Sequence, residues 1–222
     1  MKFDNLNIED NDSKKLLVTF GGIRQGMGMP VYEFYNSLKD LDCDKIFIKD
    51  VYQAWYHKGV NEEINSILKL KVLLEEVVKK KPYDKIVFIG NSMGGYGAIL
   101  FGILLNVDCV VAFSPQTFIN KLNRLWFKDG RWDKEISNVY FNNSFQKKFY
   151  NLKNFLRNNT YSTQIDIFYS ANDKLDSLHS ERLKSLKKVT LYSYQKGDHN
   201  LIKELRADDE LFRIIRERIL KE

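Results

Sequence analysis

Residues 87–102, VFIGNSMGGYGAILFG, constrain the fold more than any other stretch of this chain. An apolar run leads into Gly90-Asn91-Ser92-Met93-Gly94, and small residues then open a helix-like run. A G-x-S-x-G turn between a strand and a helix holds its serine in a strained conformation that exposes the hydroxyl. Glycines on both sides let the strand and the helix approach closely. The stretch therefore predicts a strand, a sharp turn that presents Ser92, and a helix.

The competing interpretation is a phosphate-binding glycine turn of a dinucleotide fold. That reading is weaker, because the G-x-G-x-x-G pattern is absent and no acidic ribose-binding residue ends a following strand. We therefore expect no nucleotide cofactor. The two cysteines, Cys43 and Cys109, form neither a metal-binding spacing nor a disulfide framework, so no metal is expected either.

The rest of the chain alternates strand-like and helix-like segments. Strand-like runs fall at 15–20, 45–49, 85–89, 109–113, 165–169 and 189–194. Helical periodicity begins at Pro30, covers 62–80 and returns over 201–220. Such alternation predicts a single α/β domain over 1–222, a three-layer sandwich whose mostly parallel sheet has about six strands.

The segment 117–164 interrupts this rhythm with many aromatic residues interleaved with Lys, Arg and Asn. A structureless loop of that length is uncommon in a compact domain. We expect an inserted helical lid, and the alternative is an extra packing layer with no substrate contact.

A serine nucleophile needs a base and an acid, which in this strand–turn–helix context follow in the order Ser, Asp or Glu, His. Of the three histidines, His57 precedes Ser92 and His179 falls within a helix-like run. His199, between the last strand and the last helix, is the predicted base. Asp173, just after the fifth strand-like run, is the preferred acid to orient it, and Asp176 is the alternative.

An oxyanion requires backbone N–H donors aimed at the developing charge. Met93, the residue after the nucleophile, is the first predicted donor. The turn after the first strand-like run supplies the second, from Gly22 or Ile23, and the sequence does not decide between these two.

Composition excludes some partners. The net charge is +6 and the pI about 9.1, but no block of like charges forms a nucleic-acid arm. Attraction to an anionic substrate, an acidic carrier protein or anionic lipid head groups stays open. We expect no membrane span and no secretory signal, and hence a cytoplasmic protein.

These motifs together resemble the α/β-hydrolase superfamily across nearly the whole chain. The resemblance rests on FGG after the first strand, GNSMGG at the turn, SAND after the fifth strand and GDH before the last helix. The N-terminal antiparallel strands common in that superfamily are reduced here, although residues 2–8 could supply one.

Two more stretches, DVYQAWYHKG at 50–59 and AFSPQTF at 112–118, are similar to a bacterial subgroup associated with surface polysaccharides. That resemblance implies a sugar O-acetyltransferase, with Trp55, Tyr56 and His57 lining a sugar site and Trp126 of the lid as a further contact. A packed aromatic corner is the alternative for residues 55–57.

The sequence thus predicts a serine-dependent acyl-transfer enzyme, either an esterase or an O-acetyltransferase, with an ester or glycan substrate. An acyl-CoA is one candidate donor. The alternatives are a thioesterase acting on an acyl carrier and a non-catalytic partner in a biosynthetic or secretion complex. The oligomeric state is left open.

Overall fold

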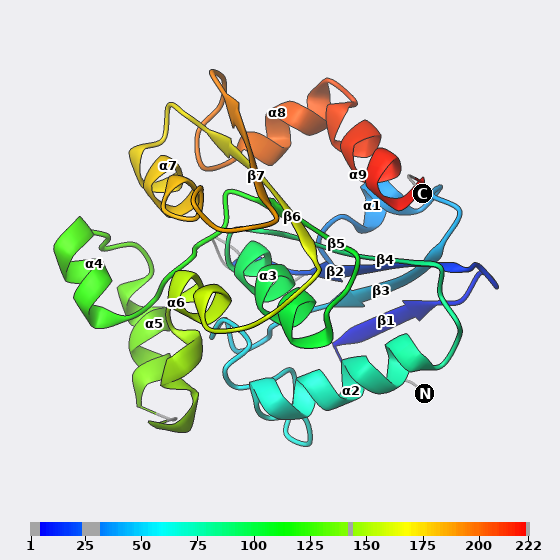
Figure 1. Cartoon of the computed structure of the whole chain (residues 1–222), viewed down its shortest axis with the longest axis horizontal. Helices are drawn as coiled ribbons and strands as arrows, with labels where there is room; N and C mark the ends of the chain where they lie inside the picture. The colour runs from blue at the N-terminus through cyan, green and yellow to red at the C-terminus, as the bar shows by residue number, and fades with distance from the viewer. Residues whose placement is uncertain (1–4, 24–31, 142–143, 221–222) are drawn as a thin grey trace.

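The computed structural model describes residues 5–23, 32–141 and 144–220. This part of the chain forms a seven-stranded sheet in the order β1-β3-β2-β4-β5-β6-β7 (Figure 1). Its strands are β1 (Leu6–Glu9), β2 (Lys15–Phe20), β3 (Asp44–Ile48), β4 (Lys85–Asn91), β5 (Cys109–Phe113), β6 (Gln164–Ser170) and β7 (Val189–Tyr194). Strand β1 pairs antiparallel with β3, and the remaining pairs are parallel.

Helices cover both faces of the sheet. They are α1 (Tyr35–Leu38), α2 (Ile67–Lys79), α3 (Met93–Leu105), α4 (Lys121–Phe127), α5 (Asp133–Tyr140), the 3₁₀ helix η1 (Ser144–Phe149), α6 (Leu152–Arg157), α7 (Lys174–Glu181), α8 (Leu201–Ala207) and α9 (Glu210–Leu220). One apolar core contains side chains of α2, α3 and α6, and a second contains side chains of α1, α8 and α9. The predicted three-layer α/β sandwich is therefore confirmed.

Strand β1 extends the predicted sheet by one strand at the edge. It lies over residues 6–9, close to the 2–8 segment from which the sequence suggested a further strand. Its antiparallel register places Leu6 opposite Ile48 and Glu9 opposite Lys45.

Three predicted helices differ in length from the sequence periodicity. The 62–80 helix begins only at Ile67, where the Ser66 hydroxyl accepts a hydrogen bond from the Lys69 N–H and caps it. The 201–220 helix divides into α8 and α9 because Asp209 has a φ of 55°. Pro30, where the sequence predicts a helix to begin, lies outside the described residues, and α1 begins only at Tyr35, after Phe34 with a φ of 69°, and ends at Leu38.

Helix α3 is the central helix of one layer. It packs against β2, β4 and β5 below and against α2 and α6 on its other sides. Because neighbours surround it, residues Met93 to Ile103 are all buried. This burial explains why the run after the GNSMG turn is apolar on every side rather than amphipathic.

The insertion between β5 and β6 is helical, with α4, α5, η1 and α6 in sequence. Helix α6 packs on α3, whereas α4 and α5 lie at the left edge of the molecule in Figure 1. A gating role for this segment stays a prediction. Within the described residues, no helix is long and apolar enough to cross a membrane.

Candidate active site

Ser92 stands on a strained turn between β4 and α3. Its backbone has a φ of 53° and a ψ of −115°, outside the regions that side chains ordinarily favour. The two flanking glycines make this turn possible. A Cβ on Gly90 would lie 2.1 Å from the Gly94 carbonyl oxygen, and one on Gly94 would lie 2.1 Å from the Phe20 carbonyl oxygen. The G-x-S-x-G spacing is therefore a steric requirement of this turn.

A hydrogen-bonded chain runs from Ser92 through His199 to Asp176. The Ser92 Oγ lies 3.0 Å from His199 Nε2. On the other side of the ring, His199 Nδ1 lies 2.8 Å from Asp176 Oδ1 and 3.0 Å from Oδ2. With the proton on Nδ1 donated to the carboxylate, Nε2 is free to accept the serine proton. This is the arrangement that nucleophilic catalysis by serine needs.

This geometry contradicts the prediction that Asp173 is the acid that orients His199. Asp173 is the N-cap of α7, where its Oδ1 accepts hydrogen bonds from the N–H groups of Leu175 and Asp176, both at 2.9 Å. Asp176 lies within the first turn of that helix and contacts the imidazole. Asp176, the alternative that the sequence left open, is therefore the carboxylate that is positioned to orient His199.

Arg131, from the insertion, donates a hydrogen bond to the Asp176 carboxylate. Its Nη1 donates to Asp176 Oδ1 at 2.9 Å, and its Nε donates to Asp129 Oδ1 at 3.1 Å. Burial of Asp176 favours its protonated form, but the hydrogen bonds and charges of His199 and Arg131 outweigh burial and lower its pKa. The Asp176 carboxylate is therefore kept ionised by His199 and by a contact from the segment between β5 and β6.

Asp129 also joins the insertion to α7 through His179. Burial lowers the pKa of His179 to about 4, so the ring is neutral at neutral pH. Its Nδ1 accepts from the Thr117 N–H at 2.9 Å, which leaves Nε2 to donate to Asp129 Oδ2 at 2.9 Å. His179 thus fixes the helix that carries Asp176 without being charged.

Three backbone N–H groups lie near the nucleophile. Gly22 N–H donates to the Glu33 carboxylate at 2.7 Å. Neither Met93 N–H nor Ile23 N–H has an acceptor among the residues that the structure describes. Met93 and Ile23 therefore stay the predicted oxyanion donors, and Gly22 is the candidate whose N–H is already engaged.

Glu33 is a site residue that the sequence patterns did not single out. Besides the bond from Gly22, its other carboxylate oxygen accepts from Asn91 Nδ2 at 3.1 Å, next to the nucleophile. Burial raises the pKa of Glu33 to about 6, because these hydrogen bonds only partly offset the loss of water. The turn after β2 and the Ser92 turn are thereby joined through one carboxylate.

Ser92 and His199 open onto a cleft with a volume of about 1090 Å³, more than a single small acyl group needs. Its walls combine aromatic and hydrogen-bonding side chains. The aromatic ones are Tyr32, Phe34, Tyr35, Trp132 and Phe212, and the polar ones include Glu33, Asn91, Asn200, Lys203 and Arg206.

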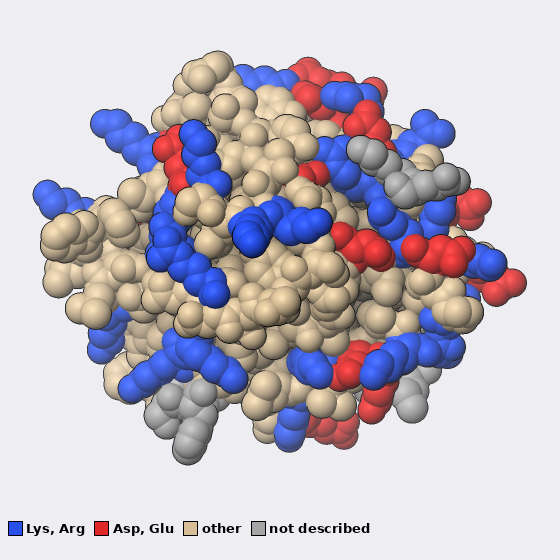
Figure 2. Space-filling view, in the orientation of Figure 1, with Lys and Arg blue, Asp and Glu red and all other residues tan. Residues whose placement is uncertain are grey.

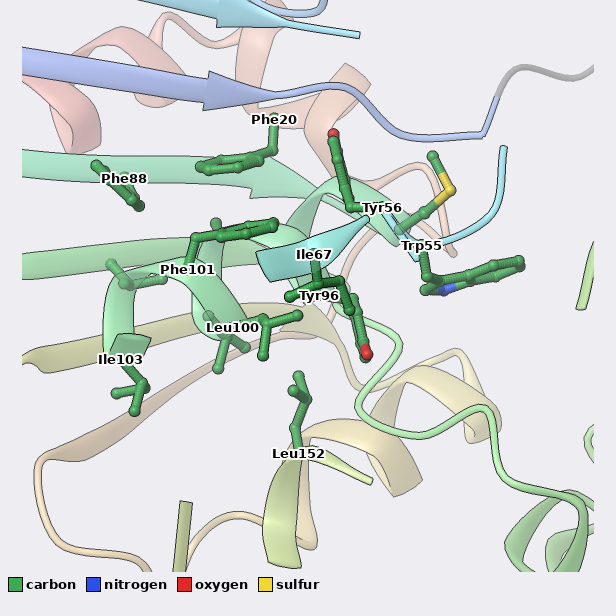
Figure 3. Packing of buried hydrophobic residues seen from close by; sticks show 14 of the residues in the cluster. Phe20, Trp55, Tyr56, Ile67, Phe88, Tyr96, Leu100, Phe101, Ile103 and Leu152 are labelled. Atoms are coloured by element: carbon green, nitrogen blue, oxygen red, sulfur yellow. The ribbon is translucent and has the colours of Figure 1, made fainter. Parts of the chain in front are cut away.

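The structure does not bring the predicted sugar contacts at 55–57 to this cleft. Trp55, Tyr56 and His57 are fully buried, and Figure 3 shows Trp55 and Tyr56 packed among the core side chains. Trp55 Nε1 donates to Gln116 Oε1 and the Tyr56 hydroxyl donates to the Gly21 carbonyl oxygen. The packed aromatic corner is the correct alternative.

Of the predicted contacts, His57 has a structural role and Trp126 is exposed to solvent. Burial lowers the pKa of His57 to about 3, and its Nε2 lies 3.0 Å from the Tyr96 hydroxyl. Trp126 points to solvent on α4 and is absent from the residues that line the cleft. Within the insertion, it is Trp132 that reaches the cleft. The clustering of aromatics in 117–164 indicated that such a residue exists but not which one it is.

The fold and this site define an α/β hydrolase architecture, and comparisons with known proteins agree. The chain superimposes on the capsule O-acetyltransferase of Neisseria meningitidis serogroup A with a TM-score of 0.72 and 15% identity, covering 97% of this chain and 92% of that one. It superimposes on FphF, a fluorophosphonate-binding serine hydrolase of Staphylococcus aureus, with a TM-score of 0.61 and 17% identity, covering 91% and 83% of the two chains.

One curated protein is similar in sequence. The chain is 25% identical over 163 residues to a Mycoplasma pneumoniae protein named "Putative esterase/lipase 3". The matched region covers 68% of this chain and 60% of that protein's length. No family model matches the chain. The α/β-hydrolase fold is thus shown, and the similar proteins are named as an O-acetyltransferase, a serine hydrolase and a putative esterase/lipase.

Proposed function

We propose that this protein is a serine-dependent acyltransferase that moves an acyl group from an ester or thioester donor to a hydroxyl of a glycan. The observation that carries the proposal is the hydrogen-bonded chain Ser92–His199–Asp176 at the edge of a large cleft. The likeness to a capsule O-acetyltransferase over nearly the whole chain supports the choice of acceptor.

In the first half-reaction, His199 Nε2 takes the Ser92 proton while Oγ attacks the acyl carbonyl. Asp176 accepts the hydrogen bond from His199 Nδ1 and stabilises the imidazolium that forms. The tetrahedral intermediate collapses when the donor's leaving oxygen or sulfur receives the proton from Nε2. The product is an acyl-enzyme on Ser92 and a free alcohol or thiol.

The second half-reaction repeats these steps with the acceptor. Its hydroxyl loses a proton to His199 Nε2 and attacks the acyl carbonyl, and Ser92 is released when it regains the proton. In both halves the negative charge on the carbonyl oxygen is stabilised by N–H donors, for which Met93 and Ile23 are free. Gly22 can join them once Glu33 releases its N–H.

The walls of the cleft favour a glycan over water as the acceptor. Trp132 and Tyr32 offer apolar surface beside the reacting groups, and Asn200 and Arg206 offer hydrogen bonds to hydroxyls. A bound ring that fills the cleft would displace water from the acyl-enzyme. A small esterase substrate would leave much of this volume wet.

The proposal is tested by measuring how the acyl group divides between water and an added sugar acceptor. With p-nitrophenyl acetate as donor, we expect added oligosaccharide to raise p-nitrophenol release and to appear acetylated in mass spectra. Ser92→Ala should form no acetylated sugar. If all acetyl is recovered as free acetate whatever sugars are present, the protein is an esterase and the acceptor assignment is wrong. If neither product forms, the acyl-transfer assignment itself fails.

The contact from Arg131 to Asp176 predicts a pH signature. In Arg131→Met, Asp176 loses a hydrogen bond and a neighbouring cation that lower its pKa, so its carboxylate becomes protonated at a higher pH. The acidic limb of the kcat/KM profile should therefore move to higher pH, by roughly one pH unit. Rates of p-nitrophenyl acetate hydrolysis across pH measure this shift.

Arg218→Met is the matched control for that prediction. Arg218 is also largely buried and pairs with the buried Asp166, but it makes no contact with Asp176 or Arg131. Its acidic limb should stay in place. If Arg131→Met instead lowers kcat/KM equally at every pH and the acidic limb does not move, Arg131 has only a structural role.

A further inference from the structure

Helix α4 buries an arginine and exposes apolar side chains, the opposite of the pattern in an ordinary surface helix. Its charged residue Arg124 points inward and is buried, with Nη1 donating to the Arg131 carbonyl oxygen at 2.8 Å and the guanidinium paired with Asp133. Three of its four large apolar residues point outward instead, and the fourth, Phe127, packs against Phe118. Leu122, Leu125 and Trp126 are 79%, 80% and 81% exposed.

These three side chains form one surface. They occupy positions i, i+3 and i+4 of the helix, which lie on the same face. Single exposed apolar residues are common, but a group of large ones on one face marks an interaction site. Together with Lys121 and Lys128 at its two ends, we call this face the α4 ledge.

The charge around the ledge is positive. Lys121 and Lys128 are both exposed, and the Asp133 carboxylate nearby is paired with Arg124. Figure 2 shows an uncharged surface rimmed by Lys and Arg at the left of the view, where α4 lies in Figure 1. A partner for the ledge must therefore accept apolar side chains and carry negative charge.

We propose that the α4 ledge binds the surface of an anionic lipid bilayer. A membrane interface takes up Trp and Leu side chains from a projecting helix, and its acidic head groups attract the flanking lysines. The ledge projects from the edge of the molecule, so a flat and deformable surface can meet it. This inference rests on α4 alone and does not depend on the proposed catalytic function.

Two other occupants fit the ledge less well. A second copy of the chain would bring Lys121 and Lys128 against the same lysines of its partner, and like charges repel. An acidic protein would need a matching apolar groove for Trp126 and both leucines. A bilayer meets neither difficulty.

Binding of the purified protein to vesicles tests the proposal. We expect it to float with vesicles of phosphatidylcholine containing phosphatidylglycerol, and to be released as salt screens the lysines. Trp126→Ser should weaken binding about tenfold, the loss expected when one buried aromatic side chain is removed. Lys121→Gln with Lys128→Gln should weaken binding to the anionic vesicles and remove its salt dependence.

Leu68→Ser with Val72→Ser is the matched control. These residues are the exposed apolar pair on α2, 53% and 52% exposed, and their loss should leave vesicle binding unchanged. Thermal unfolding followed by circular dichroism reports the intact fold in every variant, so loss of vesicle binding can be separated from misfolding.

Three results would overturn the proposal. The first is no binding to anionic vesicles, or binding that the control and the ledge variants lose equally. The second is a dimer that Trp126→Ser dissociates, which would assign the ledge to a second copy. The third is capture by an acidic carrier protein in place of vesicles, which would assign it to a protein partner.

Discussion

We expect Asp176→Asn to lower kcat for p-nitrophenyl acetate by about 10⁴-fold, whereas Asp173→Asn should leave it within about twofold. The carboxylate of Asp176 holds His199 Nδ1–H at 2.8 Å and keeps the tautomer that accepts the serine proton. An Asn at 176 can present its amide N–H to the ring and favour the wrong tautomer. Steady-state kinetics of the two purified variants measures the difference.

Asp173→Asn is a sharp control because asparagine is as good an N-cap as aspartate. It should preserve the bonds to the N–H groups of Leu175 and Asp176, and with them the position of α7. Asp173→Ala should lose about 1 kcal/mol of unfolding free energy. Full activity in Asp176→Asn with loss in Asp173→Asn would reverse the assignment of the acid.

Ser92→Ala should abolish fluorophosphonate labelling and lower ester turnover by about 10⁶-fold. The hydroxyl is the group that forms the acyl-enzyme, and the neighbouring residues offer no substitute at the same position on the turn. Mass spectrometry of the labelled protein and p-nitrophenol release measure the two effects.

Thermal unfolding separates this loss from damage to the fold. Alanine meets the same backbone strain as serine at a φ of 53°, so the melting temperature should change little. Labelling of Ser92→Ala at the wild-type rate would place the nucleophile elsewhere and remove the basis of the proposed function.

Local patterns in the sequence predict much of this molecule. Alternating apolar runs give the parallel strands, since a buried strand needs an unbroken apolar stretch, as in 85–89 and 109–113. Glycine spacing predicts the Ser92 turn because backbone atoms approach too closely there for any Cβ. His199 follows from its place between the last strand and the last helix.

Residues whose partners lie far along the chain could not be assigned in this way. Asp173 and Asp176 stand on the same turn of α7, and only the packing of that helix decides which carboxylate faces His199. Arg131 reaches Asp176 across 45 residues of sequence. Trp55 and Tyr56 look like ligand contacts in the sequence, yet the fold buries them under α3.

By itself, the sequence determined the strands and the Ser92 turn, because each depends on neighbours within a few residues, and it predicted His199 as the base from its order along the chain. The tertiary structure decided the acid, the free N–H donors, the walls of the cleft and the outward face of α4. These depend on which side chains the sheet and the insertion bring together, and apolar patterning is the same for an aromatic residue in the core as for one at a surface.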